Sequence, residues 1–505
     1  MTSVKEIIDL MESPSKEDIL LIEKAYKFAE KAHEGQKRLS GEVYFNHAFE
    51  TAKILAEIKM GSVTISAGLL HDAIREGATT EESVKSEFGD EIMFLINGVT
   101  KIGQIKYGGT ERYAESLKKF LVTVSQDIRV LIIKFASRLQ NMRTFESIPI
   151  DEQQKVALET MQIYVPLADR LGVRKISREL EDISFKNLNP KEYESVFNFL
   201  KEKNEQELPK LEKFLKSVKR ALADEGITDI RTSYRQKGTY SLYKKIKRFE
   251  DKGENIDKIY DFLALRICVK TIAECYKVLG IVHGIWRPLP GYIRDFIAFP
   301  KPKGYQSLHT TVFTGDGGIV EIQIRTNEMH QKAEYGVASY IIYKDDNKNI
   351  ENKGSVKWFT HFLPKFIRHT KTNKKEEIPE WIRNLAESNE KNKEENKEKI
   401  LEDLRADIFS YRIFVFTPKG EVIDLPVGSC ILDYAYMIHS DIGNHTNSAK
   451  INGKMVAIKT ELKNGDIVEI ITKENSKPTA KWLGMVKTSM AKRHIKSFLE
   501  KGSTK

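Results

Sequence analysis

The chain has 505 residues, of which 40% are hydrophobic and 30% are charged, and its formal net charge is +10 at pH 7. This length exceeds what one hydrophobic core supports, so we expect roughly two to four domains. No apolar run approaches the ~20 residues of a membrane helix, and the N-terminus lacks the layout of a signal peptide. The 3 cysteines are scattered and support neither a disulfide frame nor a zinc site. We therefore expect a cytoplasmic protein with no membrane partner, whose positive charge suits phosphate-rich ligands.

The first part of the chain, to about residue 195, has the pattern of an all-helical region. Apolar residues recur at spacings of three and four, as in Ile22, Ala25, Tyr26 and Ala29. From about residue 228 to 345 the pattern changes to short β-branched runs separated by turns, which predicts a mixed α/β domain. We expect strands at residues 259–269, 310–313 and 319–325.

The last third of the chain contains a charged segment and then a compact β-rich module. Residues 371–400 carry eight basic and eight acidic residues, which predicts a solvated linker helix. Alternating apolar residues and turn residues predict the elements of the module. We expect a hairpin of strands 413–416 and 422–425, a helix at 431–438, a strand at 466–471 and one basic amphipathic helix at 481–499.

Two motifs in the α/β region carry the strongest chemical signal. Residues 304–311 read G-Y-Q-S-L-H-T-T, and residues 321–326 read E-I-Q-I-R-T. In a strand, the second motif presents Glu321, Gln323 and Arg325 on one face, which indicates that this face lines a polar site. Asp261, near the start of the preceding apolar run, could bring a second carboxylate close to Glu321. Two such carboxylates can hold a Mg²⁺ ion that bridges substrate phosphates.

These motifs resemble those of the RelA/SpoT-homologue family, the bacterial (p)ppGpp synthetases and hydrolases of the stringent response. The resemblance runs over nearly the whole chain. It implies a multidomain fold, with an all-α HD-type N-terminal domain, an α/β nucleotidyltransferase-like synthetase domain and a small β-grasp TGS domain. The expected boundaries are 1–195 for the HD-type hydrolase-like domain, 196–345 for the synthetase domain, 346–407 for a charged helical linker, 408–473 for the TGS domain and 474–505 for a basic helical tail.

The family's synthetase transfers pyrophosphate from ATP to the 3′-hydroxyl of GDP or GTP, and the resemblance implies this GTP/GDP diphosphokinase activity here. This sequence departs from the family's ATP-binding motif at Tyr234 and Gln236, where Gly and Pro are usual, and we interpret both substitutions as changes in loop shape. The resemblance implies that Asp261 and Glu321 serve catalysis and bind Mg²⁺. The residues implied to bind the phosphates of ATP are Arg235, Lys237, Ser241 and Lys245. Those implied to bind the acceptor nucleotide are Arg294, Tyr305, His309 and Gln323.

Arg294 stands in a segment that divides the family into two classes. Residues 291–295 read G-Y-I-R-D, where family members have a basic R-x-K-D or an acidic E-x-D-D motif. Because Arg294 keeps the basic side chain beside Asp295, the segment resembles the basic class. In the family that class accompanies bifunctional enzymes and a preference for GDP.

The N-terminal region resembles the family's Mn²⁺-dependent hydrolase but departs from it at two places. His47, His71 and Asp72 match three of the four metal ligands, whereas Ser137 stands where the family has the fourth, an aspartate. A neutral hydroxyl replaces an anionic oxygen poorly on a divalent cation. We therefore expect the Mn²⁺ site to be lost.

The family's Glu-Asp pair, which assists attack by water, reads Arg75-Glu76 here. If residues 71–76 were helical, Arg75 would lie one turn beyond His71 on the same face. Its positive charge would then lie where a cation should bind. The substrate-side residues Arg38, Asn141 and Thr144 persist, so the region is expected to be a degenerate hydrolase.

Three hypotheses remain open from the sequence. The leading one is a synthetase with a defective hydrolase half, and the second is a bifunctional synthetase and 3′-pyrophosphohydrolase. The third is a non-catalytic regulator that binds guanine nucleotides or the ribosome. In long family members the TGS domain contacts the acceptor end of uncharged tRNA on the ribosome, so ribosome or tRNA binding is expected through this module and the basic tail. Those members continue with further domains beyond the equivalent of Lys505, and both a naturally short chain and a truncated one fit the sequence.

Overall fold

A computed structural model describes most of the chain, which divides into two compact units. The predicted linker helix at 371–400, and the linker range 346–407 around it, lie outside the described residues. Of the described residues, those up to 338 belong to the first unit, and those from 412 onward, the C-terminal module, belong to the second. The described residues are 2–38, 40–76, 79–103, 127–251, 253, 259, 262–301, 305–315, 317–336, 338, 412–418, 422–463 and 465–502.

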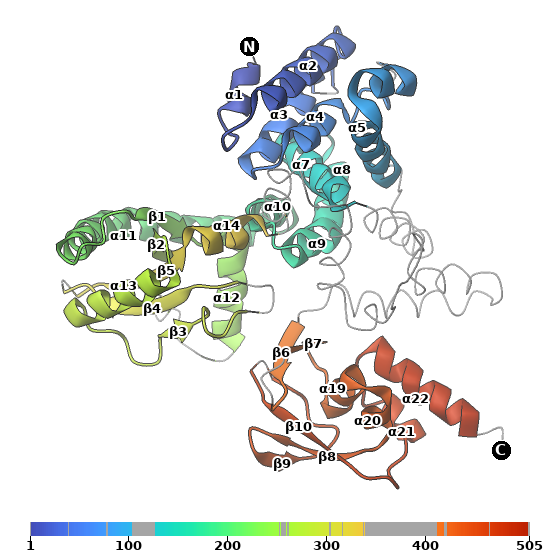
Figure 1. Ribbon diagram of the computed structural model, residues 1–505, viewed down its shortest axis with the longest axis vertical. Coiled ribbons are helices and arrows are strands. Elements are labelled where there is room, and N and C mark those ends of the chain that lie inside the picture. The colour runs from blue at the N-terminus through green and yellow to red at the C-terminus, as the bar shows by residue number, and fades with distance from the viewer. Residues whose placement is uncertain are drawn as a thin grey trace. The chain divides into compact units, whose positions relative to one another are not determined.

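The first part of the first unit is a helical bundle, which confirms the expected all-α domain (Figure 1). Helix α2 begins at a capping box in which Ser15 and Asp18 satisfy each other's backbone amides. Its Ile22, Ala25 and Ala29 are fully buried, as the helical spacing predicts. The helices are α1 (Val4–Ile8), α2 (Lys16–Ala32), α3 (Phe45–Glu57), α4 (Ser62–Leu70), α5 (Glu81–Gly103), α7 (Ile128–Thr144), α8 (Ile150–Glu159), α9 (Val165–Arg170) and α10 (Arg174–Leu188).

A five-stranded sheet forms the second part of this unit. Its strand order is β1-β2-β5-β4-β3, with β2 and β5 parallel and the other neighbours antiparallel. Helices α11 and α13 lie beside the strands (Figure 1). Their apolar side chains pack against one face of the sheet and form its core. The elements are β1 (Arg231–Gln236), β2 (Leu263–Val269), β3 (Arg294–Asp295), β4 (Leu308–Phe313), β5 (Ile319–Thr326), α11 (Pro190–Asp224), α12 (Thr239–Asp251), α13 (Ile272–Ile285) and α14 (Asn327–Tyr335).

The predicted strands 310–313 and 319–325 are confirmed by β4 and β5. The predicted strand 259–269, however, starts before the observed one. Strand β2 starts at Leu263. Ile259 is buried in a separate cluster with Val196 and Leu200 of α11 and Leu242 of α12. Its apolar character therefore serves packing between helices, and the expected strand was four residues too long at its start.

The helical bundle and the sheet domain touch through their backbones at two glycines. Gly172 follows α9, and Gly336 ends α14 on the sheet side. Both have positive φ angles, of 74° and 55°. A Cβ atom on Gly336 would lie 2.3 Å from the carbonyl oxygen of Leu171 and 2.6 Å from the Cα of Gly172. No side chain fits between these two segments, so the contact requires glycine at residue 336.

The second unit is the β-rich module, whose elements confirm the predicted hairpin and helix. Strands β6 and β7 pair antiparallel, and β10, β8 and β9 form a second small sheet. Helix α19 packs its apolar side onto these strands. The elements are β6 (Arg412–Phe416), β7 (Val422–Pro426), α19 (Ile431–Ile438), α20 (Ser440–Asn444), β8 (Thr446–Ile451), β9 (Lys454–Val456), β10 (Val468–Thr472), α21 (Ala480–Leu483) and α22 (Ser489–Gly502).

The prediction of one continuous helix over 481–499 is wrong, because the segment breaks after Leu483. Helix α21 ends there, and α22 begins at Ser489. Between them the backbone amides of Lys487 and Thr488 donate hydrogen bonds to the buried carboxylate of Asp433 in α19. An amide that donates to this carboxylate cannot also donate to a backbone carbonyl within a helix. The buried acid therefore interrupts the helical segment.

None of the helices that the structure describes combines the length and apolar character needed to cross a lipid bilayer.

Candidate functional site

The open face of the five-stranded sheet collects polar side chains from successive strands. In one row of paired residues, Arg235 of β1 is opposite Ala264 of β2, which pairs with Glu321 of β5. The neighbouring row runs through Arg266, Gln323, His309 and Arg294. Paired residues point to the same side of a sheet, so these side chains share one face. The apolar residues between them, Leu265 and Ile322 among them, point to the core instead.

The centre of this polar face is a chain of hydrogen bonds that ends on Glu321. The side-chain amide of Gln323 donates to Glu321 Oε1 at 2.8 Å, and His309 Nδ1 lies 3.2 Å from the same oxygen. The other ring nitrogen of His309 lies 2.7 Å from the hydroxyl of Tyr305. Burial lowers the pKa of His309, and contact with Glu321 opposes this shift. A neutral imidazole therefore donates from Nδ1 to the carboxylate and accepts from the tyrosine.

Positive side chains surround this chain of hydrogen bonds. Burial lowers the pKa of Lys301, and the charges of Arg174, Arg235 and Arg294 lower it further, whereas Glu321 opposes them. The guanidinium of Arg174 lies 5.2 Å from the centre of the Tyr305 ring. Such a concentration of cations in a partly buried place favours a ligand with several negative charges.

Two of these cations were missed by the sequence analysis. Lys301 precedes the first motif by only three residues, and its position between prolines marked it as a loop residue. Arg174 is the first residue of α10, far from the motif in the sequence. No local spacing could have indicated that Arg174 reaches Tyr305, because that contact depends on how α10 packs against the sheet domain.

The residues expected to bind ATP phosphates lie on β1, on the loop after it and on α12. Arg235 is on the polar sheet face, and Lys237 follows in the loop, where its amide donates to the carbonyl of Phe262 at 2.9 Å. Ser241 and Lys245 lie one turn apart on α12, which begins at Thr239. Asp261 lies outside the described residues, so its position relative to Glu321 stays a prediction.

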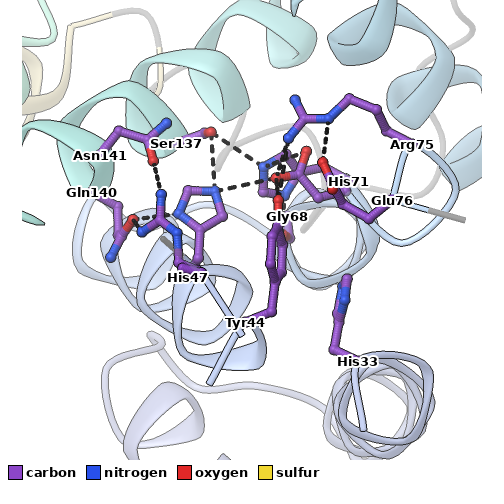
Figure 2. Close-up of polar contacts among 12 residues, drawn as sticks. His33, Tyr44, His47, Gly68, His71, Arg75, Glu76, Ser137, Gln140 and Asn141 are labelled. Carbon is purple, nitrogen blue, oxygen red and sulfur yellow. Dashed lines mark hydrogen bonds and ion pairs between the residues drawn. The ribbon is translucent and has the colours of Figure 1, made fainter. Parts of the chain in front are cut away.

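A second polar centre is buried in the helical bundle. Figure 2 shows His47 of α3, His71 after α4 and Ser137 of α7 turned toward one another, and Asp72 follows His71 in the chain. Each imidazole Nε2 lies 3.5 Å from a carboxylate oxygen of Asp72. The Ser137 hydroxyl lies 3.2 Å from His71 Nε2 and 3.4 Å from His47 Nε2. His47, His71 and Asp72 are close enough together to hold one metal ion.

Hydrogen bonds on the far side of each ring fix the orientation of both histidines. His71 Nδ1 donates to the carbonyl oxygen of Gly68 at 2.8 Å, and His47 Nδ1 donates to the side-chain oxygen of Gln140. Burial lowers the pKa of His47 to about 3 and also lowers that of His71, so both rings are neutral at pH 7. Both Nε2 lone pairs therefore face Asp72, an arrangement that suits a cation between them.

Arg75 supplies positive charge to this centre, but by a different geometry from the one predicted. Helix α4 ends at Leu70, and the amide of Ala73 bonds the carbonyl of Leu70 in a tight turn. Residues 71–76 are therefore turns, and the expectation that Arg75 shares a helix face with His71 is wrong. The turn brings the Arg75 guanidinium to 3.0 Å from Asp72 Oδ2 and 2.9 Å from Glu76.

The carboxylate of Asp72 is further held by Tyr44, a residue to which the sequence analysis gave no role. The Tyr44 hydroxyl lies 3.2 Å from Asp72 Oδ2 and 3.3 Å from an Arg75 nitrogen (Figure 2). Burial opposes ionisation of Asp72, but His71, His47 and the Arg75 guanidinium together hold its pKa below the usual range. Asp72 is therefore an anion that already has a cationic partner.

The other substrate-side residues of this region form one network. The Arg38 guanidinium donates to Asn141 at 2.6 Å, Thr144 at 3.2 Å and Gln140 at 3.3 Å. Gln140 therefore links Arg38 to His47. Its role was missed, although it follows Ser137 by three residues on α7 and so shares a helix face with it.

Comparison with known proteins identifies three regions of the chain. A family model described as HD domain matches residues 25–174, one described as a region found in RelA/SpoT proteins matches 234–348, and one for the TGS domain matches 413–472. These regions correspond to the helical bundle, to the sheet domain and to the C-terminal module. The fold class expected from the sequence is confirmed.

Relatives match along almost the whole chain. A guanosine-3′,5′-bis(diphosphate) 3′-pyrophosphohydrolase of Aquifex aeolicus is 43% identical over 95% of this chain and 64% of its own length. A GTP pyrophosphokinase of Myxococcus xanthus is 40% identical over 96% of this chain and 61% of its own length. The chain thus spans less than two thirds of these two proteins.

A third relative is covered more fully. A guanosine-3′,5′-bis(diphosphate) 3′-pyrophosphohydrolase of Borreliella burgdorferi is 38% identical over 95% of this chain, which spans 68% of that protein. Its similarity extends over the helical bundle, the sheet domain and the C-terminal module together. The chain therefore belongs to the RelA/SpoT family.

Proposed function

We propose that the chain is a (p)ppGpp synthetase, which transfers the pyrophosphoryl group of ATP to the 3′-hydroxyl of GDP or GTP. The observation that carries this proposal is the polar sheet face, where Glu321 is oriented by two hydrogen bonds and surrounded by cations. A relative named GTP pyrophosphokinase and the RelA/SpoT region at 234–348 support it. The two substrates and both phosphate chains would require this excess of positive charge.

In the proposed reaction, the acceptor 3′-oxygen forms a bond to the β-phosphorus of ATP. The bond from that phosphorus to the α,β-bridging oxygen breaks, AMP leaves and the hydroxyl gives up its proton. Arg235, Lys237, Ser241 and Lys245 would hold the phosphates of ATP by charge and hydrogen bonding. Glu321 would receive the proton or help to hold a metal. Gln323 and His309 keep its carboxylate in one orientation.

The residues also fit a Mg²⁺ ion. Glu321 offers a carboxylate oxygen on a face rich in polar groups, and oxygen is the ligand that Mg²⁺ prefers. Glu321 together with Asp261 would hold the ion, which supplies neutralising charge to the phosphates when bound. Asp261 has no described contacts, so its share in the site rests on the family motif.

For the acceptor nucleotide we propose Tyr305, His309, Gln323 and Arg294. Tyr305 offers a ring beside the cation Arg174, and His309 is tied to both Tyr305 and Glu321. Arg294 donates to the carbonyl oxygens of Gly291 and Ile293, at 2.6 Å and 3.0 Å. These two hydrogen bonds stabilise the loop that carries Arg294. In the family, a basic side chain at this position accompanies a preference for GDP.

We further propose that the hydrolase half is impaired. Ser137 offers a neutral oxygen where the family has a carboxylate, and the Arg75 guanidinium lies 3.0 Å from the remaining acid, Asp72. A metal would have to compete with that guanidinium and would gain only one anionic ligand. The residues therefore fit the family's four-ligand Mn²⁺ centre poorly, and no hydrolytic step is assigned to them.

One observation favours the second hypothesis, a bifunctional enzyme. Both histidines keep the far-side hydrogen bonds that direct Nε2 toward a common point, and two relatives named 3′-pyrophosphohydrolases match the chain over 95% of its length. A metal held by His47, His71 and Asp72 alone would leave room for slow hydrolysis.

One experiment separates the hypotheses. Purified protein is incubated with labelled ATP, Mg²⁺ and either GDP or GTP, and separately with labelled ppGpp and Mn²⁺, and the products are resolved by thin-layer chromatography. The proposal expects a 3′-pyrophosphorylated product in the first reaction and little pyrophosphate release in the second. Release at a rate similar to synthesis would establish the bifunctional enzyme, and no product in either would leave the non-catalytic regulator.

A further inference from the structure

The N-terminus of α12 is capped by a residue from a different part of the chain. Helix α12 follows β1, which carries Arg235, and the short loop that carries Lys237, and its first amides need partners outside the helix. Asp182, on α10, accepts a hydrogen bond from the amide of Tyr240 at 2.9 Å and another from the amide of Thr239. A carboxylate also favours the positive end of the helix dipole.

Gly238, the residue before α12, has no side chain and therefore leaves room for the Asp182 carboxylate. A Cβ atom on Gly238 would lie 3.0 Å from one oxygen of Asp182 and 3.4 Å from the other. Any side chain at Gly238 would therefore push against the carboxylate that binds the next two amides. The absence of a side chain there matches the position of Asp182.

Two further contacts hold α10 against α12. The buried ring of Phe185 packs on Tyr240 and Tyr243, with ring centres 5.1 Å and 4.8 Å apart. Glu181 pairs with Lys244 at 2.7 Å. Because Phe185 and Glu181 flank Asp182 on α10, the carboxylate is presented to α12 by a well-anchored helix surface.

The loop before α12 is thus attached at both ends. At its start, β1 pairs with β2 and the amide of Lys237 donates to the carbonyl of Phe262. At its end, Asp182 holds the first turn of α12. Burial raises the pKa of Asp182, while the amides of Tyr240 and Thr239 and the charge of Arg178 oppose this change.

We propose that Asp182 is a positioning residue for ATP, acting from α10 through the first turn of α12 on the segment that carries Arg235 at the end of β1 and Lys237 in the following loop. The inference rests on the proposed synthetase function, because it takes ATP as the ligand of that loop. In this proposal Asp182 itself contacts neither nucleotide. Its carboxylate occupies the amides at the helix N-terminus, so the phosphates are bound by the cationic side chains of the loop and helix, which must be held in place.

The test compares three variants of the full chain. Asp182→Ala removes the cap, Asp182→Asn keeps an oxygen that caps a helix about as well, and Gly238→Ala displaces the carboxylate without removing it. Glu179→Ala is the matched control, because Glu179 lies on the same helix but pairs with Arg143 of α7, at 2.6 Å. The measurements are kcat and KM for ATP and for GDP, with thermal unfolding of each variant.

Loss of the cap should raise KM for ATP about fivefold to tenfold in Asp182→Ala, the range expected from a lost helix cap. Gly238→Ala should change KM in the same direction. KM for GDP and kcat should stay within about twofold, because the acceptor residues lie on other strands. Asp182→Asn and Glu179→Ala should stay within about twofold of the unmodified protein in every parameter.

Three results would overturn the inference: an unchanged KM for ATP in Asp182→Ala, an equal rise for both nucleotides, or an Asp182→Asn variant as impaired as Asp182→Ala. Equilibrium dialysis with labelled ATP gives the same comparison without turnover. Absence of product from the unmodified protein would therefore count against the proposed function, while the ratio of ATP dissociation constants would still decide the role of Asp182.

Discussion

The guanidinium of Arg75 lies 3.0 Å from the carboxylate of Asp72, at the centre of the buried cluster in the helical bundle. Arg75 therefore supplies from within the chain part of the positive charge that a metal ion would otherwise bring. A guanidinium cannot polarise water as a metal does, and it cannot accept a proton. In the proposed function, the same contact that stabilises a buried Asp72 would work against hydrolysis.

We predict no appreciable hydrolysis of ppGpp with Mn²⁺. Ser137→Asp alone or Arg75→Glu alone should recover little activity, because one lesion weakens metal binding and the other removes assistance to water. Ser137→Asp combined with Arg75→Glu and Glu76→Asp should recover measurable activity. The assay is pyrophosphate release from ppGpp, with bound metal measured in parallel.

A control for this set is Glu34→Gln, an exposed carboxylate after α2 whose loss should change neither metal content nor activity. Turnover of ppGpp by the unmodified protein at rates close to its own synthesis would show that Ser137 and Arg75 do not disable the centre.

Synthesis should depend on the two proposed carboxylates. Glu321→Ala or Asp261→Ala should lower kcat for ppGpp formation by a factor on the order of 10²–10⁴, the range for losing a general base. Glu328→Ala removes an exposed carboxylate on α14 that pairs with Lys332 and should leave the rate unchanged. Undiminished product from both site variants would mean that the reaction occurs elsewhere in the chain.

Stability should fall as the pH is lowered, in part because of His330. Arg325 donates a hydrogen bond to His330 Nδ1 at 2.8 Å, which requires a neutral ring. Burial lowers the pKa of His330 to about 4, and Arg325, Arg266 and Arg231 lower it while Glu334 opposes them. Between about pH 6.5 and 4 the unfolded chain binds a proton that the folded chain does not, so stability decreases as pH falls through this window.

The measurement is the free energy of unfolding at pH 7 and pH 5. His330→Gln keeps an acceptor for Arg325 but does not titrate, so the loss on acidification should shrink by up to about 1 kcal/mol after allowing for solvent screening. A variant with the same pH dependence as the unmodified protein would exclude His330 as the source.

We propose that the C-terminal module binds ribosomes or tRNA through the basic side of α22. Ala491 and Ile495 face the module's core, whereas Arg493 and Lys496 are exposed. Phosphate contacts of this kind weaken as salt rises. Replacing Arg493 and Lys496 by Gln should lower the salt dependence of association by about one unit of slope per lost contact.

Co-sedimentation with ribosomes and a tRNA shift assay at several salt concentrations would measure this. Lys454→Gln, an exposed lysine on β9, is the control. Lack of any association at low salt would remove the proposal.

The strands and helices that follow a clear periodicity could be predicted from the sequence. Helix α19 matches its predicted bounds of residues 431–438, and β5 includes all of the predicted 319–325. The failures share one physical cause, which is tertiary contact. Ile259 is apolar because it packs between helices, and the tail helix breaks because Asp433 binds two amides that helical spacing alone would assign to the helix.

The candidate site shows the same division. Motif spacing and strand alternation together predicted that Glu321 and Gln323 share a polar face, since the two residues are two positions apart in one strand. The contributions of Arg174, Lys301 and Asp182 could not be predicted, because each depends on the docking of α10 or on a loop fold. Gln140 belongs to a motif that was recognised in the sequence. Its hydrogen bond to His47 could not be predicted, because it depends on how both side chains are oriented in the folded bundle.

The backbone contact between Gly172 and Gly336 gives the helical bundle a structural role that does not depend on hydrolysis. A genetic deletion of the helical bundle would strip the sheet domain of the surface against which α14 ends, and would remove α10 with its cap on α12. If the hydrolytic chemistry is impaired, as proposed, the helical bundle would still be needed to support the sheet domain.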